Sequence, residues 1–129
     1  MFQALQGSKL YQKTSEYTRA QAADPHGLIT MLFDGAIERI VAAKGAMQRN
    51  EVAVKGMLIS KAITVISGLR AHLDMEKGGE LSKNLSELYQ YMEEKLFEAN
   101  FENNEETLNE IVQLIQTLRD GWVQIKDSR

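Results

Sequence analysis

Residues 75–100, MEKGGELSKNLSELYQYMEEKLFEAN, decide the fold of this chain. After the Gly78-Gly79 pair, apolar residues recur every three or four positions, which is the spacing of one face of an α-helix. A glycine pair supplies the positive φ that closes a preceding helix, so the stretch predicts a helical hairpin with its turn at these two residues. Tyr91 and Phe97 fall outside the apolar face, which comprises Leu81, Leu85, Leu88, Tyr89, Met92, Leu96 and Ala99.

Similar periodicity on both sides of residues 80–102 predicts three more long helices. The first starts at Asp24-Pro25, an N-cap followed by a proline at the first helical position, and runs to residue 49. The second starts at Asn50 as N-cap and runs to about residue 76, where the hairpin turns. For the last helix, Asn103 and Glu106 have the spacing of a capping box, and the apolar pattern ends near Lys126.

Four helices of similar length joined by short connections predict an all-α fold, an antiparallel up-down four-helix bundle over residues 24–129. Residues 1–23 are expected to form a short N-terminal arm or helix. Gly7 and the polar run 12–16 weaken a continuous helix, whereas Leu10 and Tyr11 are apolar enough to favour docking on the bundle. A mobile arm and a loosely docked arm therefore both stay open.

The composition indicates a soluble domain that binds neither nucleic acid nor membranes. Hydrophobic residues make up 43% of the 129 residues, enough for a core, and the formal net charge is -3 with no basic stripe along the chain. No uninterrupted apolar run has the roughly 18 residues of a membrane helix, and no signal sequence is expected at the start. The absence of cysteine fits the cytoplasm and excludes disulfides.

The sequence offers no residue set for catalysis, for a metal or for another cofactor. A di-metal site inside a helical bundle needs glutamate three positions before histidine, but Ala23 precedes His26 and Leu69 precedes His72 at that spacing. His72 also lacks the Lys-Gly spacing of a histidine phosphotransfer domain, because Leu-Asp-Met-Glu follows it. Without cysteine or a glycine-rich phosphate loop, we expect a non-enzymatic protein with no cofactor.

The first two helices carry more apolar residues than a minimal bundle seam needs. One file at i, i+4 spacing is Phe33, Ile37 and Val41, and it is expected beside a second file of Ile59 and Ile63. Two interpretations stay open: a wide core stripe, or a groove for amphipathic helices of another protein. On the second interpretation, the candidate partner-binding residues are Leu10, Tyr11, Ile29, Phe33, Ile37, Val41, Met57, Ile59, Ile63 and Tyr91.

Three motifs resemble the FliS family of flagellar export chaperones, and together they cover the chain in order. Residues 24–37, DPHGLITMLFDGAI, resemble the family pattern S-P-x-x-L-I-x-M-L-Y-D-G-A-I, with Asp24 in place of serine and Phe33 in place of tyrosine. Residues 85–100 resemble L-x-x-L-Y-x-Y-x-x-x-x-L-x-x-A-N, and residues 118–122 resemble L-R-D-x-W. The turn over residues 73–81 fits as well.

The resemblance implies a cytoplasmic, non-enzymatic chaperone that binds the disordered C-terminal segment of flagellin. Such proteins prevent premature polymerisation of flagellin, deliver it to the export-gate protein of the flagellar type III apparatus, and in some members contact an anti-sigma factor. The family also implies an antiparallel bundle whose arm, with a tyrosine where Tyr11 stands, covers part of the binding surface. The alternative is a regulatory or assembly scaffold, a homodimer without flagellin binding.

Overall fold

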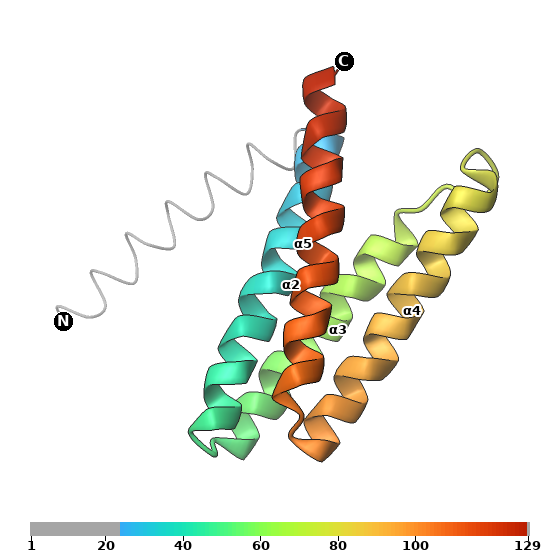
Figure 1. The fold of residues 1–129 in the computed structure, drawn as a ribbon. Helices are drawn as coiled ribbons and strands as arrows, with labels where there is room; N and C mark the ends of the chain where they lie inside the picture. The colour runs from blue at the N-terminus through green and yellow to red at the C-terminus, as the bar shows by residue number, and fades with distance from the viewer. Residues whose placement is uncertain (1–23, 129) are drawn as a thin grey trace, which may run out of the picture.

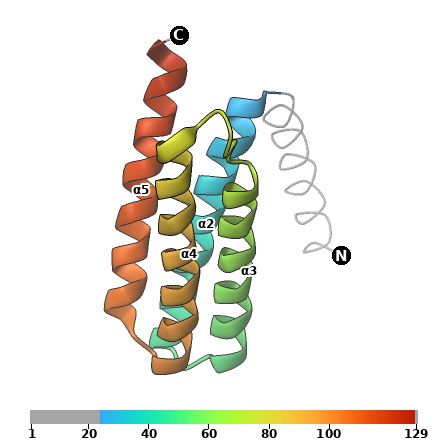
Figure 2. The same cartoon turned by 90° about the vertical axis from the view of Figure 1, so that its right-hand side faces the viewer.

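A computed structural model describes residues 24–128, and these form four α-helices. Consecutive helices run in opposite directions, and the last packs back against the first, so the four close into a bundle (Figure 1). Figure 2 shows the same antiparallel order from the side. The predicted all-α up-down bundle is confirmed, whereas the predicted arm, residues 1–23, lies outside the described residues. The helices are α2 Pro25–Gln48, α3 Val52–Ala71, α4 Gly79–Glu102 and α5 Glu105–Ser128.

The start of α2 is built as its sequence predicts. The Asp24 carboxylate accepts a hydrogen bond from the backbone N–H of His26 at 3.0 Å, which satisfies one of the free amides of the first turn. Pro25 occupies the first helical position, where its missing N–H removes no intrahelical hydrogen bond. The helix ends at Gln48, with Arg49 as its C-cap.

The connection between α2 and α3 differs from the prediction. Asn50 is not an N-cap: it has φ 57 and lies in the turn that follows α2, and Glu51 stands at the N-cap of α3 without a side-chain cap hydrogen bond. Asparagine is favoured both at N-caps and in the left-handed region, so its presence before an apolar pattern does not distinguish the two positions. Asn50 therefore lies in the predicted loop, but it belongs to the turn that ends α2 and does not cap α3.

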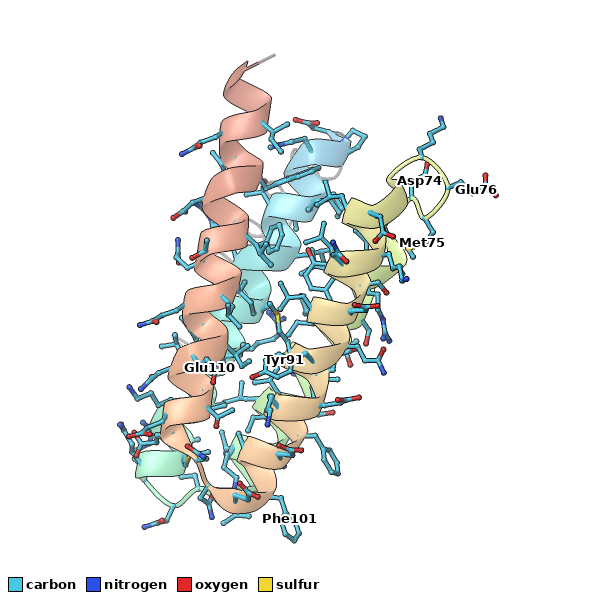
Figure 3. All side chains as sticks on the ribbon, turned by 45° about the vertical axis from the view of Figure 1, so that its right-hand side comes forward. Asp74, Met75, Glu76, Tyr91, Phe101 and Glu110 are labelled. Carbon is cyan, nitrogen blue, oxygen red and sulfur yellow. The ribbon has the colours of Figure 1, made fainter. Side chains whose placement is uncertain are left out.

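The connection between α3 and α4 is longer than predicted, because α3 ends at Ala71 rather than near residue 76. The Asp74 carboxylate accepts hydrogen bonds from the backbone N–H groups of Glu76 at 3.2 Å and Lys77 at 2.9 Å. An aspartate that binds its own following backbone in this way stabilises a turn in place of a further helical turn. The loop carries the labelled residues Asp74, Met75 and Glu76 at one end of the bundle (Figure 3).

The glycine pair opens α4 instead of closing α3. Gly79 is the first residue of α4 and has φ +52, the conformation that glycine adopts without a steric penalty. Gly78 has an ordinary φ of -80, and it is needed for space: a Cβ there would lie 1.7 Å from the Ser82 hydroxyl oxygen. That hydroxyl donates a hydrogen bond to the Asp74 carbonyl oxygen at 2.9 Å. This hydrogen bond joins the loop to the first turn of α4.

The turn between α4 and α5 is displaced by one residue from the prediction. Asn103 has φ 55 and ends α4 as its C-cap. The N-cap role belongs to Asn104, whose side-chain oxygen accepts a hydrogen bond from the backbone N–H of Thr107 at 3.2 Å. The predicted capping box of Asn103 and Glu106 is therefore wrong, because Thr107 stands three residues after the true cap.

The core is assembled from the inward face of every helix, as the apolar periodicity predicts. Its largest fully buried side chains are Ile40, Ile59, Ile66, Met92, Leu96, Leu108, Ile111 and Ile115. Leu81 was predicted on the buried face of its helix, but its side chain is 67% exposed. It lies in the first turn of α4, at the end of the bundle where the helices leave an apolar cavity between them.

Three of the polar contacts between neighbouring helices involve a lysine or an arginine. Lys55 of α3 is buried, and its ammonium donates hydrogen bonds to the Asn100 carbonyl oxygen at 2.9 Å and to the side-chain oxygen of Asn103. Arg119 of α5 pairs with Asp34 of α2 at 2.6 Å, and this contact raises the pKa of the guanidinium. The third contact joins α3 to α4, where Glu93 accepts from Ser67 and Arg70.

Among residues 24–128, α3 is the one helix long and apolar enough to cross a membrane by length and composition. The predicted lack of an uninterrupted apolar run still holds, since Lys55, Lys61 and Arg70 interrupt it. A core helix of a soluble protein meets the same criterion, and α3 packs against both α2 and α4.

Candidate partner-binding surface

An apolar cavity of about 340 Å³ lies at one end of the bundle. There α4 and α5 stand apart, having separated from the turn that joins them at the opposite end (Figure 1). All four helices contribute to the cavity, so it is the part of the shared interior that the core leaves unfilled. Its lining residues are Ile29, Phe33, Leu69, His72, Leu73, Leu81, Leu85, Tyr89, Leu118, Gly121, Trp122 and Ile125.

The chemistry of the cavity suits apolar side chains. Its lining is aliphatic and aromatic, and the only groups along it able to bind a polar ligand come from His72, Tyr89 and Trp122. The His72 ring already contacts the Gly68 carbonyl oxygen at 2.8 Å, and the Trp122 N–H donates to the His26 carbonyl oxygen at 3.0 Å. In the described part of the chain, no group of three or more His, Cys, Asp or Glu residues could hold a metal ion. The lining therefore favours contact with apolar groups over polar ones.

Tyr89 shows how apolar the surroundings of the cavity are. Its side chain is 4% exposed, and burial raises the pKa of its phenol from 10.0 to about 12. Burial disfavours the phenolate, so the folded protein holds the proton to higher pH than the unfolded chain does.

We expect this difference to destabilise the protein in alkali. Between pH 10 and 12 the unfolded chain loses the Tyr89 proton first, so the free energy of unfolding falls as the pH rises through that window. The loss attributable to Tyr89 should reach about 1 kcal/mol by pH 11. Urea unfolding of wild type and Tyr89→Phe at pH 9 and pH 11 measures it as a double difference. Equal losses in the two proteins would contradict this assignment.

Two further hollows lie on the sides of the bundle. One, between α3 and α4, has a volume of about 390 Å³ and is lined by Ile63, Phe97 and three glutamates. Phe97 is 70% exposed, so it presents most of its apolar surface beside this hollow. The other, between α2 and α5, has a volume of about 320 Å³ and is lined by Ile40, Val41, Lys44, Leu108, Asn109, Val112 and Gln113.

The two apolar files do not lie beside each other, contrary to the expectation. Val41 faces α5 across one hollow, whereas Ile63 faces α4 across the other. The exposed part of each file therefore borders a different seam, α2–α5 for Val41 and α3–α4 for Ile63. A single groove formed by both files is therefore wrong.

The remaining candidate residues divide by exposure. Phe33 and Ile59 belong to the core, at 3% and 1% exposed, as the interpretation of a wide core stripe predicts. Ile29 and Ile37 are half-buried, Met57 is exposed on α3, and Leu10 and Tyr11 lie outside the described residues. Whether these residues bind a partner stays a prediction.

Tyr91 lies at the seam between α4 and α5, away from the core. Its hydroxyl donates a hydrogen bond to the Glu110 carboxylate at 3.1 Å, and the two side chains meet across the seam (Figure 3). That hydrogen bond raises the pKa of the Tyr91 phenol. The ammonium of Lys95 lies 5.7 Å from the ring centroid, so polar contacts cover this tyrosine in part.

Sequence reasoning missed most of the cavity. Leu85 was predicted on the buried face of its helix, and nothing in a helical pattern tells where two helices move apart. One usable signal was present: apolar residues at helix ends, such as Leu81 and Ile125, extend the stripes beyond the length that a neighbour covers. Both are exposed at the rim of the cavity.

Comparison with known proteins matches this chain to one family over nearly its whole length. The family model described as "Flagellar protein FliS" matches residues 7–129. The flagellar secretion chaperone FliSB of Pseudomonas aeruginosa is 44% identical over 119 residues, covering 92% of this chain and 94% of the relative. The flagellar secretion chaperone FliS of Salmonella typhimurium is 43% identical, covering 92% and 89%, and that of Bacillus subtilis 30%, covering 88% and 81%. The chain therefore belongs to the FliS family, which consists of secretion chaperones and not of enzymes.

Proposed function

We propose that this protein is a flagellar export chaperone that binds the disordered C-terminal segment of flagellin. It prevents premature polymerisation and delivers flagellin to the flagellar export gate. One observation carries the proposal: an apolar cavity that four helices leave unfilled at one end of the bundle. The names of the relatives support the export role, and the cavity supports the binding of apolar residues from an unfolded segment.

A disordered segment suits this cavity for a thermodynamic reason. Ordering the segment costs conformational entropy, so the complex must gain free energy from burial of apolar surface. Leu85, Leu118 and Trp122 can enclose apolar side chains projecting from one face of a short helix, as in other grooves that bind amphipathic helices. Contact within the cavity would then supply the main anchor.

The two lateral hollows extend this proposal beyond a single anchor. They lie on different seams, α2–α5 and α3–α4, so a long segment wrapped around the bundle can contact both. Ile37, Val41 and Ile63 then act as direct contacts, with Phe33 and Ile59 supporting them from the core. Ile29 is a contact within the cavity, while Met57 and Tyr91 are exposed contacts between the hollows.

The binding proposal is tested by isothermal titration with a synthetic peptide of the flagellin C-terminal segment. A flagellin peptide of equal length from outside that segment is the control. We expect one-to-one binding of the C-terminal peptide and none of the control. A dimer, seen by size-exclusion chromatography, that ignores both peptides would support the scaffold alternative instead.

The N-terminal arm is proposed to compete with flagellin for these apolar surfaces. Deletion of residues 1–17 removes Leu10 and Tyr11, so the truncated protein should bind the flagellin peptide more tightly than the full chain. A synthetic peptide of residues 1–17, added in excess, should reverse the gain. Unchanged affinity after the deletion would contradict the competition.

The place of action and further partners follow the same proposal. A chaperone that receives newly made flagellin acts in the cytoplasm, before export. The export-gate protein is then the receiver of the complex, and an anti-sigma factor is a further partner that the family resemblance suggests.

A further inference from the structure

The ring of His26 and the indole of Trp122 form a reciprocal contact between the first turn of α2 and the last turns of α5. The two rings stack with their centroids 4.4 Å apart and an interplanar angle of 7°. The His26 Nε2 atom lies 2.7 Å from the Trp122 carbonyl oxygen, and the indole N–H donates to the His26 carbonyl oxygen at 3.0 Å. Three contacts between the same two residues fix both position and rotation of the indole.

Trp122 also lines the apolar cavity, and it is the only tryptophan of the chain. One face of the indole is covered by the imidazole, so the rest of the side chain forms the wall that a ligand would meet. A large flat side chain placed at a helix end can rotate away unless something holds it. Ile29, one turn after His26 on α2, lines the same cavity, so the contact also sets the distance between two of its walls.

We infer that His26 is a positioning residue for the binding site: it holds Trp122 as a fixed wall of the apolar cavity. The consequence for flagellin affinity rests on the proposed function. The positioning itself does not, because it concerns the ligand-free protein. The family pattern that residues 24–37 resemble leaves the position of His26 unspecified, so the inference concerns this chain in particular.

Two substitutions separate the hydrogen bond from the stack. His26→Gln keeps an N–H donor able to reach the Trp122 carbonyl oxygen but loses the ring, and His26→Phe keeps a ring but loses the donor. Both keep the bond from the indole to the backbone of residue 26, which no side-chain change removes. Asn104→Ala is the matched control, because it removes the side-chain cap of α5, the helix that carries Trp122, at the end of the bundle remote from both rings.

Fluorescence of Trp122 tests the positioning without any ligand. In both His26 variants we expect a red-shifted emission and stronger quenching by acrylamide, because the indole gains contact with water. Asn104→Ala should change neither. Circular dichroism and urea unfolding identify any variant that fails to fold. If one His26 variant fails to fold, the fluorescence of the other tests the positioning of Trp122. Emission and quenching unchanged in both variants would overturn the inference.

Ligand binding tests the consequence for the cavity. Without the stack or the hydrogen bond, the Trp122 indole must be ordered again when the peptide binds. The affinity of either variant for the flagellin peptide should therefore fall by about tenfold. The apolar dye anilinonaphthalene sulfonate, which reports on apolar cavities whatever their natural ligand, should also bind less tightly to both variants. If wild type binds the dye but not the peptide, the proposed function fails while the role of His26 is still decided by the dye. If both variants match wild type with the dye, His26 does not shape the cavity.

Discussion

A Leu85→Asp variant is expected to bind the flagellin C-terminal segment at least 100-fold more weakly than wild type while keeping its helicity. Leu85 is half-buried and lines the cavity from α4. In the free protein, water entering from the open end can solvate an aspartate there. Once an apolar segment fills the cavity, the carboxylate loses that water with no partner, at a cost of several kcal/mol. A 100-fold loss corresponds to about 2.7 kcal/mol, within that range.

Val52→Asp is the matched control for this experiment. Val52 is an exposed apolar residue at the start of α3, which lies at the end of the bundle remote from the cavity. Its substitution introduces the same charge without touching the cavity lining. Titration with the flagellin peptide should therefore show near wild-type affinity for Val52→Asp. Equal loss in both variants would mean that net charge governs binding and not the cavity.

The second large effect concerns stability and the buried lysine. Lys55→Met removes the ammonium that binds the Asn100 carbonyl oxygen and the Asn103 side chain, and it leaves these acceptors without their donor. Loss of these two partly buried hydrogen bonds from a charged donor should lower the free energy of unfolding by about 3 kcal/mol. For a domain of this size, the melting temperature should fall by roughly 10 °C. Urea and thermal unfolding followed by circular dichroism measure both quantities.

Lys61→Met provides the comparison, because Lys61 is an exposed lysine on the same helix. It removes the same charge and adds the same side chain, so it should change the free energy of unfolding by less than about 0.5 kcal/mol. If Lys55→Met were as stable as Lys61→Met, the buried ammonium would contribute nothing beyond the packing of its aliphatic stem.

The existence and order of the helices could be predicted because apolar periodicity over more than twenty residues reflects the one face that each helix buries. The helix ends were less predictable for a specific reason. Asn50 and Asn103 were both assigned as N-caps, and both lie in the left-handed region after a helix. Asparagine serves both positions, and only the backbone path distinguishes them.

The candidate site was less predictable than the fold. A helical pattern tells which face is apolar but not which neighbour covers it, so Val41 and Ile63 could not be assigned to separate seams. The cavity depends on the angle at which α4 leaves α5, and that angle follows from side-chain packing along both helices. The contact of His26 with Trp122 joins residues 96 positions apart, which no local pattern reveals.

The two ends of the bundle differ in how they are held. As a result, the local stability of α4 is expected to decrease from its C-terminal end to its N-terminal end. At its C-terminal end, the ammonium of Lys55 binds the last turn and the cap residue. Its N-terminal end borders the cavity, with Leu81 exposed. Backbone amides near Leu96 should therefore exchange with solvent deuterium only through global unfolding, whereas those near Leu85 exchange through brief local opening. On the proposed function, a segment that enters and leaves at this end requires only the local opening near Leu85 and not global unfolding.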